Sequence, residues 1–175
     1  GFDTRIVIKF GDIFREEGWI AIAVNDFFDS IVDDRLVSSK SLHGALLQTY
    51  WAGNTDDWNR QVEEQLTGAP CSFETRTGGK QNRYAIGTAV AVKKDVNRFL
   101  CVALSHTEVS NQETKASSSD LHHAVCGLLR EARSVCGNET LSIPLMGSGL
   151  SRVGIKNNIL VDLILTAIFE ETKKN

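Results

Sequence analysis

The residues best suited to chemistry lie in a short glycine-containing stretch, residues 143–155. An apolar run typical of a strand leads into Gly147, Ser148 and Gly149, and a helical pattern follows. Glycines let a backbone approach a ligand closely, and backbone N–H groups at the start of a helix bind anions. Arg152 could add a charged contact to a phosphate oxygen. The stretch therefore predicts a phosphate-binding loop between a strand and a helix.

Two familiar phosphate-binding patterns do not fit this loop. The P-loop pattern GxxxxGK[ST] would need lysine where Ile155 stands, and Lys156 comes one place too late. The GxGxxG loop of dinucleotide-binding folds follows the first strand, whereas this loop lies near the C-terminal end of the chain. For an isolated GSG, a tight turn that binds nothing is the remaining alternative.

Histidine and cysteine spacing indicates no metal site. The four cysteines form no CxxC pair, and they are Cys71, Cys101, Cys126 and Cys136. His122 and His123 are adjacent on an expected helix and therefore face different directions. We expect reduced structural thiols, as in cytosolic proteins, and no metal or cofactor.

Length and charge limit the remaining possibilities. A chain of 175 residues suits one domain, and its net charge of -3 does not indicate binding of duplex nucleic acid. No apolar run approaches the length of a transmembrane helix. The chain enters a strand-like segment almost at once and stops directly after a helix-like segment. We therefore expect both ends to be cut points within a longer protein.

The elements that must position the loop follow from hydrophobic periodicity. Strands are expected over residues 5–10, 19–24, 84–92, 98–105 and 140–145. Helices are expected over 41–52, between 55 and 68, between 117 and 137, and over 155–173, the last well buried because it is apolar on most sides. Residues 25–40 read as an irregular polar segment. This order predicts an α/β sandwich with a mixed sheet.

Several stretches together resemble a known family. The segments IKFGDIF, WIAIAVN, LHGALLQTYW, YAIGTAVAV and LSIPLMGSGLSRVGI occur in the order and spacing of a macro domain. The resemblance covers nearly the whole chain and implies one domain over residues 1–175, a three-layer α/β/α sandwich with a mixed central sheet. It also implies that ADP-ribose binds at the carboxyl ends of the central strands, where open α/β sheets usually bind ligands.

The resemblance assigns roles to particular residues. Asp12 would accept a hydrogen bond from the adenine amino group, Ile13 would form part of the adenine slot, and Asn25 would lie near the distal ribose. The loop that wraps the diphosphate, with the wall beside it, would comprise Leu145, Met146, Gly147, Ser148, Gly149, Leu150, Ser151 and Arg152.

Three departures from the pattern concern the distal ribose. Phe28 stands where hydrolytic macro domains often carry a second asparagine, SSKS replaces a glycine run, and His43 replaces an acidic residue. An apolar ring cannot orient a water molecule, whereas His43 is either a base near neutral pH or a structural residue. Phe27 and Phe28 could stack on a ring. The residues expected around the distal ribose are Asn25, Phe27, Phe28, Ser39, Lys40, Ser41, Leu42 and His43.

One subgroup of macro domains resembles the chain further. RYAIGTAVAV followed by RFLCVALSHTE is similar to the macro domain of bacterial antiphage Thoeris-type effectors, in which two transmembrane helices precede the domain. That resemblance implies a cytoplasmic domain tethered to the inner membrane and an oligomeric full-length protein. A partner TIR enzyme would make the signal from NAD, as an amino-acid conjugate such as histidine-ADP-ribose.

The resemblance thus implies a binding module in preference to an enzyme, because Phe28 and His43 replace the usual polar pair and a sensor that destroyed its signal would reset itself. The alternative is an ADP-ribosyl hydrolase acting on proteins or small esters, with His43 as the base and Asn25 positioning the ribose. A third possibility is a protein-interaction domain with a degenerate pocket, which would gain no stability from nucleotide.

Overall fold

A computed structural model describes residues 4–149 and 153–173 and contains a mixed sheet at its centre. Its strands are β1 (Trp19–Asn25), β4 (Ala89–Lys94), β5 (Asn97–Thr107), β6 (Thr114–Lys115) and β7 (Leu141–Ser142). The strand order is β4-β5-β1-β7, and β6 pairs with the end of β5. β1 runs parallel to β5 and β7, whereas β4 and β6 are antiparallel to β5. The expected mixed sheet is therefore confirmed.

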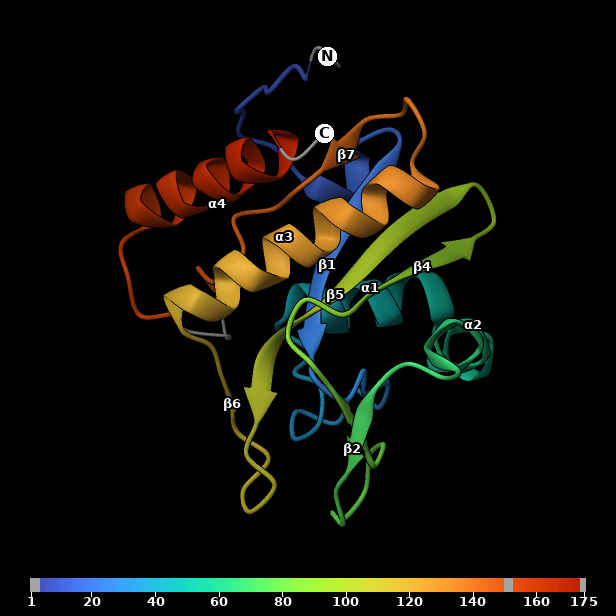
Figure 1. Ribbon diagram of the computed structural model, residues 1–175. Helices are drawn as coiled ribbons and strands as arrows, with labels where there is room; N and C mark the ends of the chain where they lie inside the picture. Colours follow the sequence, from blue (N-terminus) through green and yellow to red (C-terminus); the bar gives the residue numbers. More distant parts are fainter. Residues whose placement is uncertain (1–3, 150–152, 174–175) are drawn as a thin grey trace.

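Helices cover both faces of this sheet, as Figure 1 shows. They are α1 (Leu42–Trp51), α2 (Asp56–Leu66), α3 (Ser118–Val135) and α4 (Asn157–Thr172). α1 and α2 pack on one face, and α3 and α4 pack on the other. The three-layer α/β/α sandwich is thus confirmed.

The alternation of side chains along the central strands produces the two layers of core. In β1, Ile20, Ile22 and Val24 pack with α1 and α2, whereas Trp19 and Ala21 pack with α3 and α4. Successive side chains of a strand point to opposite faces, so a continuous apolar run is what a strand buried on both sides requires. Each large apolar side chain buried in this way contributes roughly 1.5–3 kcal/mol.

Two expected strands differ in the structure. Residues 5–10 form no strand, and Val7, Ile8 and Phe10 are exposed, because no described strand lies alongside to share backbone hydrogen bonds. The expected strand over 84–92 is divided by a turn at Gly87, whose φ is +89°. Its first part, β3 (Asn82–Tyr84), pairs with β2 (Cys71–Phe73) as a separate hairpin.

The C-terminal elements are also less regular than expected. The strand predicted over 140–145 is reduced to β7, and Pro144, which has no N–H to donate, follows shortly after it. α4 buries one face only, because Ile159 and Phe169 are exposed. Among the helices that the structure describes, none is long and apolar enough to cross a bilayer.

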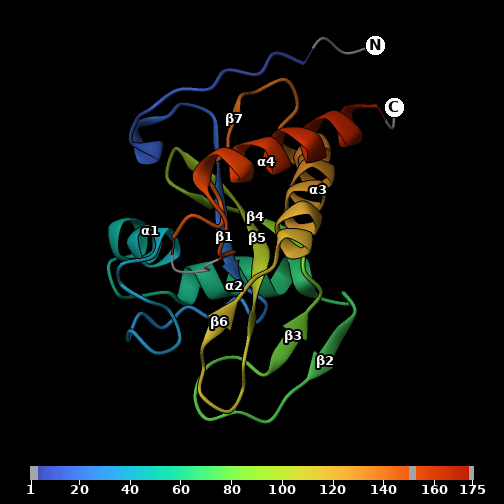
Figure 2. The same cartoon turned by 90° about the vertical axis from the view of Figure 1, so that its left-hand side faces the viewer.

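The loops beyond the carboxyl ends of β1 and β5 form one end of the molecule. The β2–β3 hairpin and β6 extend from this end, as Figure 2 shows. A short 3-10 helix, η1 (Ile13–Arg15), precedes β1. Ligands of open parallel sheets bind at the carboxyl ends of strands, so this end is where a site is expected.

Candidate functional site

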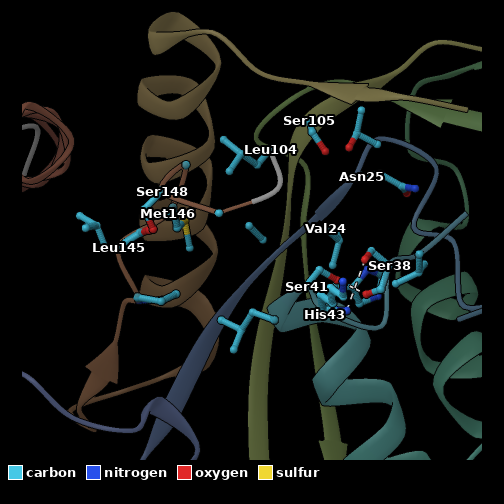
Figure 3. A pocket seen from close by; sticks show the side chains of 18 of the residues that line it. Val24, Asn25, Ser38, Ser41, His43, Leu104, Ser105, Leu145, Met146 and Ser148 are labelled. Atoms are coloured by element: carbon cyan, nitrogen blue, oxygen red, sulfur yellow. Dashed lines mark hydrogen bonds between the residues drawn. The ribbon is translucent and has the colours of Figure 1, made fainter. Parts of the chain in front are cut away.

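A cavity of about 420 Å³ lies at the carboxyl ends of β1 and β5. The strands contribute Ala23, Val24, Asn25, Leu104 and Ser105 to its lining. Figure 3 shows Leu145, Met146 and Ser148 on one side and Ser38, Ser41 and His43 on the other. The volume is within the range of about 300–1,000 Å³ that small-molecule sites occupy.

One wall is the glycine loop that follows β7. Gly147 has a φ of +85°, and a Cβ at this position would lie 2.6 Å from Cγ2 of Val153. The hydroxyl of Ser148 donates a hydrogen bond to the carbonyl of Leu145 at 2.6 Å, which closes the turn. Met146 is buried behind it. Glycine is required here both by the left-handed backbone and by the close contact.

The opposite wall is the N-terminal end of α1. Ser41 caps the helix, and its hydroxyl accepts a hydrogen bond from the N–H of Gly44 at 2.9 Å. A Cβ at Gly44 would lie 2.1 Å from the carbonyl oxygen of Ser38. Only glycine therefore lets the preceding segment pack this closely against α1. Lys40 and Leu42 also line the cavity. The partial positive charge of a helix N-terminus therefore lies beside it.

The expected order of strand, glycine loop and helix is confirmed, since α4 follows the loop from Asn157. However, none of the described residues of α4 lines the cavity. The helix N-terminus at the site belongs instead to α1, which is distant in sequence. The two walls could thus hold an anion between a helix N-terminus and a glycine turn.

The floor of the cavity is fixed by the side chain of Asn25. Its Oδ1 accepts hydrogen bonds from the N–H groups of Phe27 and Asp29, at 3.3 and 3.1 Å. Its Nδ2 donates to Oδ2 of Asp29 at 2.9 Å. Asn25 lines the cavity, but these bonds engage its amide with the loop that follows β1.

A buried ion pair holds the same loop from behind. Oδ2 of Asp29 lies 2.9 Å from a guanidinium nitrogen of Arg76, and both side chains are completely buried. The backbone N–H of Lys80 donates to the other carboxylate oxygen, also at 2.9 Å. Residues 25–29 and the segment before β3 are therefore fastened together.

His43 lies in an apolar environment at the cavity. Its side chain is buried, its ring centroid is 5.6 Å from that of Trp58, and its Nε2 has no hydrogen-bond partner among the described residues. Burial lowers the pKa of His43 to about 3, and the charge of Lys80 acts in the same direction. The imidazole is thus neutral at pH 7, and so low a pKa makes it a poor general base there.

Comparison with known proteins decides the family. The family model described as "Thoeris protein ThsA, Macro domain" matches residues 6–175. The chain belongs to this macro-domain family. The resemblance to the macro domain of Thoeris effectors is confirmed.

Individual relatives agree with this assignment. This chain is 30% identical over 162 residues to Thoeris protein ThsA of Bacillus amyloliquefaciens (strain Y2). That match covers 85% of the chain and 50% of the relative, so the chain spans about half the length of the curated relative. The macrodomain of Mycobacterium tuberculosis DarG has the same fold, with a TM-score of 0.59 at 14% identity over 96% of this chain and 92% of that one.

The predicted residues that this macro domain brings together come from both walls and the floor. They are Asn25, Lys40, Ser41, Leu42, His43, Leu145, Met146, Gly147, Ser148 and Gly149. Leu150, Ser151 and Arg152 lie outside the described residues. Sequence reasoning missed Ser38, Ser105 and Thr114. Ser105 could have been found from its place at the end of a central strand, whereas Thr114 belongs to a two-residue strand without a clear pattern.

The structure does not place Phe27 or Phe28 in this cavity. The ring of Phe27 contacts the guanidinium groups of Arg76 and Arg83, whose Cζ atoms are 4.1 and 4.9 Å from its centroid. Phe28 is fully buried in the core, in edge contact with Tyr84, and has a φ of 53°. Neither ring is available to stack on a ligand in the cavity, because cation–π contacts and core packing occupy them.

Three further predicted residues lie outside the lining. Asp12 is exposed and caps η1 by accepting a hydrogen bond from the N–H of Phe14 at 3.1 Å. Ile13 packs against the core beside α1. Ser39 donates hydrogen bonds from its N–H and hydroxyl to Asp34, both at 2.7 Å. Asp12 and Ser39 therefore stabilise neighbouring turns, and Ile13 contributes to the core.

A second set of titratable groups lies beneath the end of β5. Asp26 is completely buried and accepts a hydrogen bond from the N–H of Thr107 at 3.0 Å. Burial raises the pKa of Asp26 despite that bond and the nearby Arg83. His106 lies between Asp26 and Asp120, 3.5 and 3.2 Å from their carboxylates, and does not line the cavity.

Proposed function

We propose that this macro domain is a receptor for an ADP-ribose-type nucleotide signal in antiphage defence. The observation that carries the proposal is the cavity between the α1 N-terminus and the Gly147 turn. Both walls favour an anion, because one is the positive end of a helix and the other is a turn that brings backbone close. A diphosphate between the walls would leave the ribose at the distal end near Ser38, Ser41 and His43.

The lining supports binding in preference to hydrolysis. No carboxylate occurs among the described residues that line the cavity, and His43 is neutral and desolvated. Phe28, at the position of a water-holding asparagine in hydrolytic relatives, is part of the core. The arrangement therefore offers contacts for a ligand and no base matched to neutral pH.

The family supports a finer proposal. The signal would be an amino-acid conjugate such as histidine-ADP-ribose, made by a partner TIR enzyme, and the full-length protein would be an oligomer tethered to the inner membrane. Lys40 is exposed at the rim of the cavity and could contact a phosphate or the group attached to the ribose. Binding can act on such an assembly only if two states of it differ in affinity for the ligand.

Calorimetric titration with ADP-ribose and with histidine-ADP-ribose tests the proposal, with chromatography of both ligands afterwards. We expect binding of intact ligand, tighter for the conjugate. Release of free ADP-ribose from the conjugate would favour a hydrolase instead. The absence of heat and of thermal protection with either ligand would remove the nucleotide-binding proposal.

A matched pair of lysine variants makes the test specific to the cavity. Lys40→Ala should weaken binding by roughly three- to tenfold and reduce its salt dependence, because a rim charge is lost. Lys173→Ala removes an exposed lysine outside the lining, just beyond the end of α4, and should leave binding unchanged. Equal losses in the two variants would mean that only net charge matters.

A further inference from the structure

A cluster of metal-ligating side chains lies between α3 and α4. His122 and Cys126 are one helical turn apart on α3, so their side chains share a face. Packing of α4 against α3 brings Glu170 to the same place, 48 residues after His122. None of the three residues lines the nucleotide cavity.

The distances within this cluster are close to those of a coordination site, and small side-chain movements would complete it. Nε2 of His122 lies 2.8 Å from Oε2 of Glu170. The Sγ atom of Cys126 lies 3.8 Å from the same nitrogen, and the three ligand atoms all lie within 4.8 Å of one another. A tetrahedron with metal–ligand bonds of about 2.0–2.3 Å has edges of roughly 3.3–3.8 Å. The sulfur–nitrogen edge already fits, and the nitrogen–oxygen edge would have to widen by about half an ångström.

We propose that His122, Cys126 and Glu170 bind a divalent transition-metal ion of the zinc class. A thiolate and an imidazole are ligands that select zinc over magnesium or calcium, and a carboxylate is a regular third ligand. Binding would release the proton of the Cys126 thiol to solvent, and His122 would bind as a neutral imidazole through Nε2, with its proton on Nδ1. One thiolate and one carboxylate would then neutralise its double charge.

The burial of the three groups matches a site open on one side. The His122 side chain is 33% exposed and that of Glu170 is 51% exposed, whereas Cys126 is almost completely buried. An ion can therefore enter from the solvent past the imidazole and carboxylate and meet the thiolate behind them. A water molecule would occupy the fourth position, and the ion would fasten α3 to α4.

Cobalt titration of metal-free protein tests the site directly. Tetrahedral Co²⁺ bound to a thiolate has a charge-transfer band in the near ultraviolet and intense visible bands. We expect both at one equivalent of Co²⁺, and their loss when zinc is added. Absence of the charge-transfer band in the wild-type protein would overturn the proposal.

Cysteine variants assign the band. Cys126→Ala should abolish it, whereas Cys71→Ala should retain it, because Cys71 is exposed and lies on β2 outside the cluster. Loss of the band in Cys71→Ala with retention in Cys126→Ala would overturn the proposal.

Variants of the two partly exposed ligands test the site even if Cys126→Ala does not fold. His122→Gln and Glu170→Gln should each weaken cobalt binding by roughly tenfold or more, with unchanged circular dichroism. His123→Gln, next to the cluster on α3, should not weaken it. Unchanged cobalt affinity in both His122→Gln and Glu170→Gln would overturn the proposal even if Cys126→Ala did not fold.

Discussion

Acidification should destabilise the folded chain through His43. Folding lowers the pKa of His43 from the ordinary value of 6.5 to about 3, chiefly by burial. Between these values the unfolded chain binds a proton at this residue and the folded chain does not. The free energy of unfolding therefore falls as the pH drops through this window, and the stability is fully present only above pH 6.5.

The size of the effect follows from the two pKa values. Within the window, each pH unit costs about 1.4 kcal/mol, the free-energy equivalent of one bound proton. Integration from pH 7 to pH 5 gives about 2 kcal/mol from His43 alone. For a chain of this length, that loss lowers the melting temperature by roughly 4–8 °C.

Urea unfolding at pH 7 and pH 5 measures this loss in the wild-type protein and in His43→Leu. Other titrating groups, including Asp26 with its raised pKa, are present in both proteins and cancel in the comparison. We expect the variant to lose about 2 kcal/mol less than the wild type. His123→Ala removes an exposed histidine instead and should lose as much as the wild type.

Equal losses in the wild type and His43→Leu would refute the reasoning. They would mean that His43 takes up a proton in the folded state at this pH. The imidazole would then be accessible to acid–base chemistry, and the hydrolase alternative would regain its proposed base.

Three other predictions concern the loops and charges around the cavity. Gly147→Ala should destabilise the protein by about 1–3 kcal/mol in urea unfolding and weaken nucleotide binding, because residue 147 has a φ of +85° and no room for a Cβ. In the control Gly149→Ala, the new Cβ meets nothing within 4 Å, so this variant should keep the stability of the wild type. Asp29→Asn should cost about 3 kcal/mol by breaking a fully buried ion pair, whereas Glu64→Gln in an exposed pair should cost less than about 1 kcal/mol in the same assay. Nucleotide affinity measured by calorimetry should fall as salt concentration rises, because the attraction at an open cavity is screened.

The central layers of the fold could be predicted from the sequence because their signals are local. The apolar runs of β1 and β5 are long enough to be buried on both faces. Ser117 and Asp120 form the capping box that begins α3, a local signal close to the predicted start of that helix. A wrong prediction is the strand over residues 5–10, which have the alternation of a strand but pair with no described strand.

The site was predicted less completely because its environment comes from distant segments. The glycine loop and the start of α1 carry recognisable residues and lie at the cavity. Nothing local to Phe27 reveals that Arg76 and Arg83 contact its ring. The sequence indicated no metal site, because Glu170 joins His122 and Cys126 only through the packing of α4.

The loop behind the cavity has a consequence for the order of folding. Asp29 bonds to Arg76 and Lys80, 47 and 51 residues later, and Asp26 bonds to Thr107, 81 residues later. Bringing residues so far apart in sequence together costs chain entropy before the hydrogen bonds can form, and contacts of this kind slow folding. Helices α1 and α3 can form from local contacts, but the cavity floor needs three separate segments at once. A partly folded or partly synthesised chain should therefore lack the cavity, which forms together with the complete core.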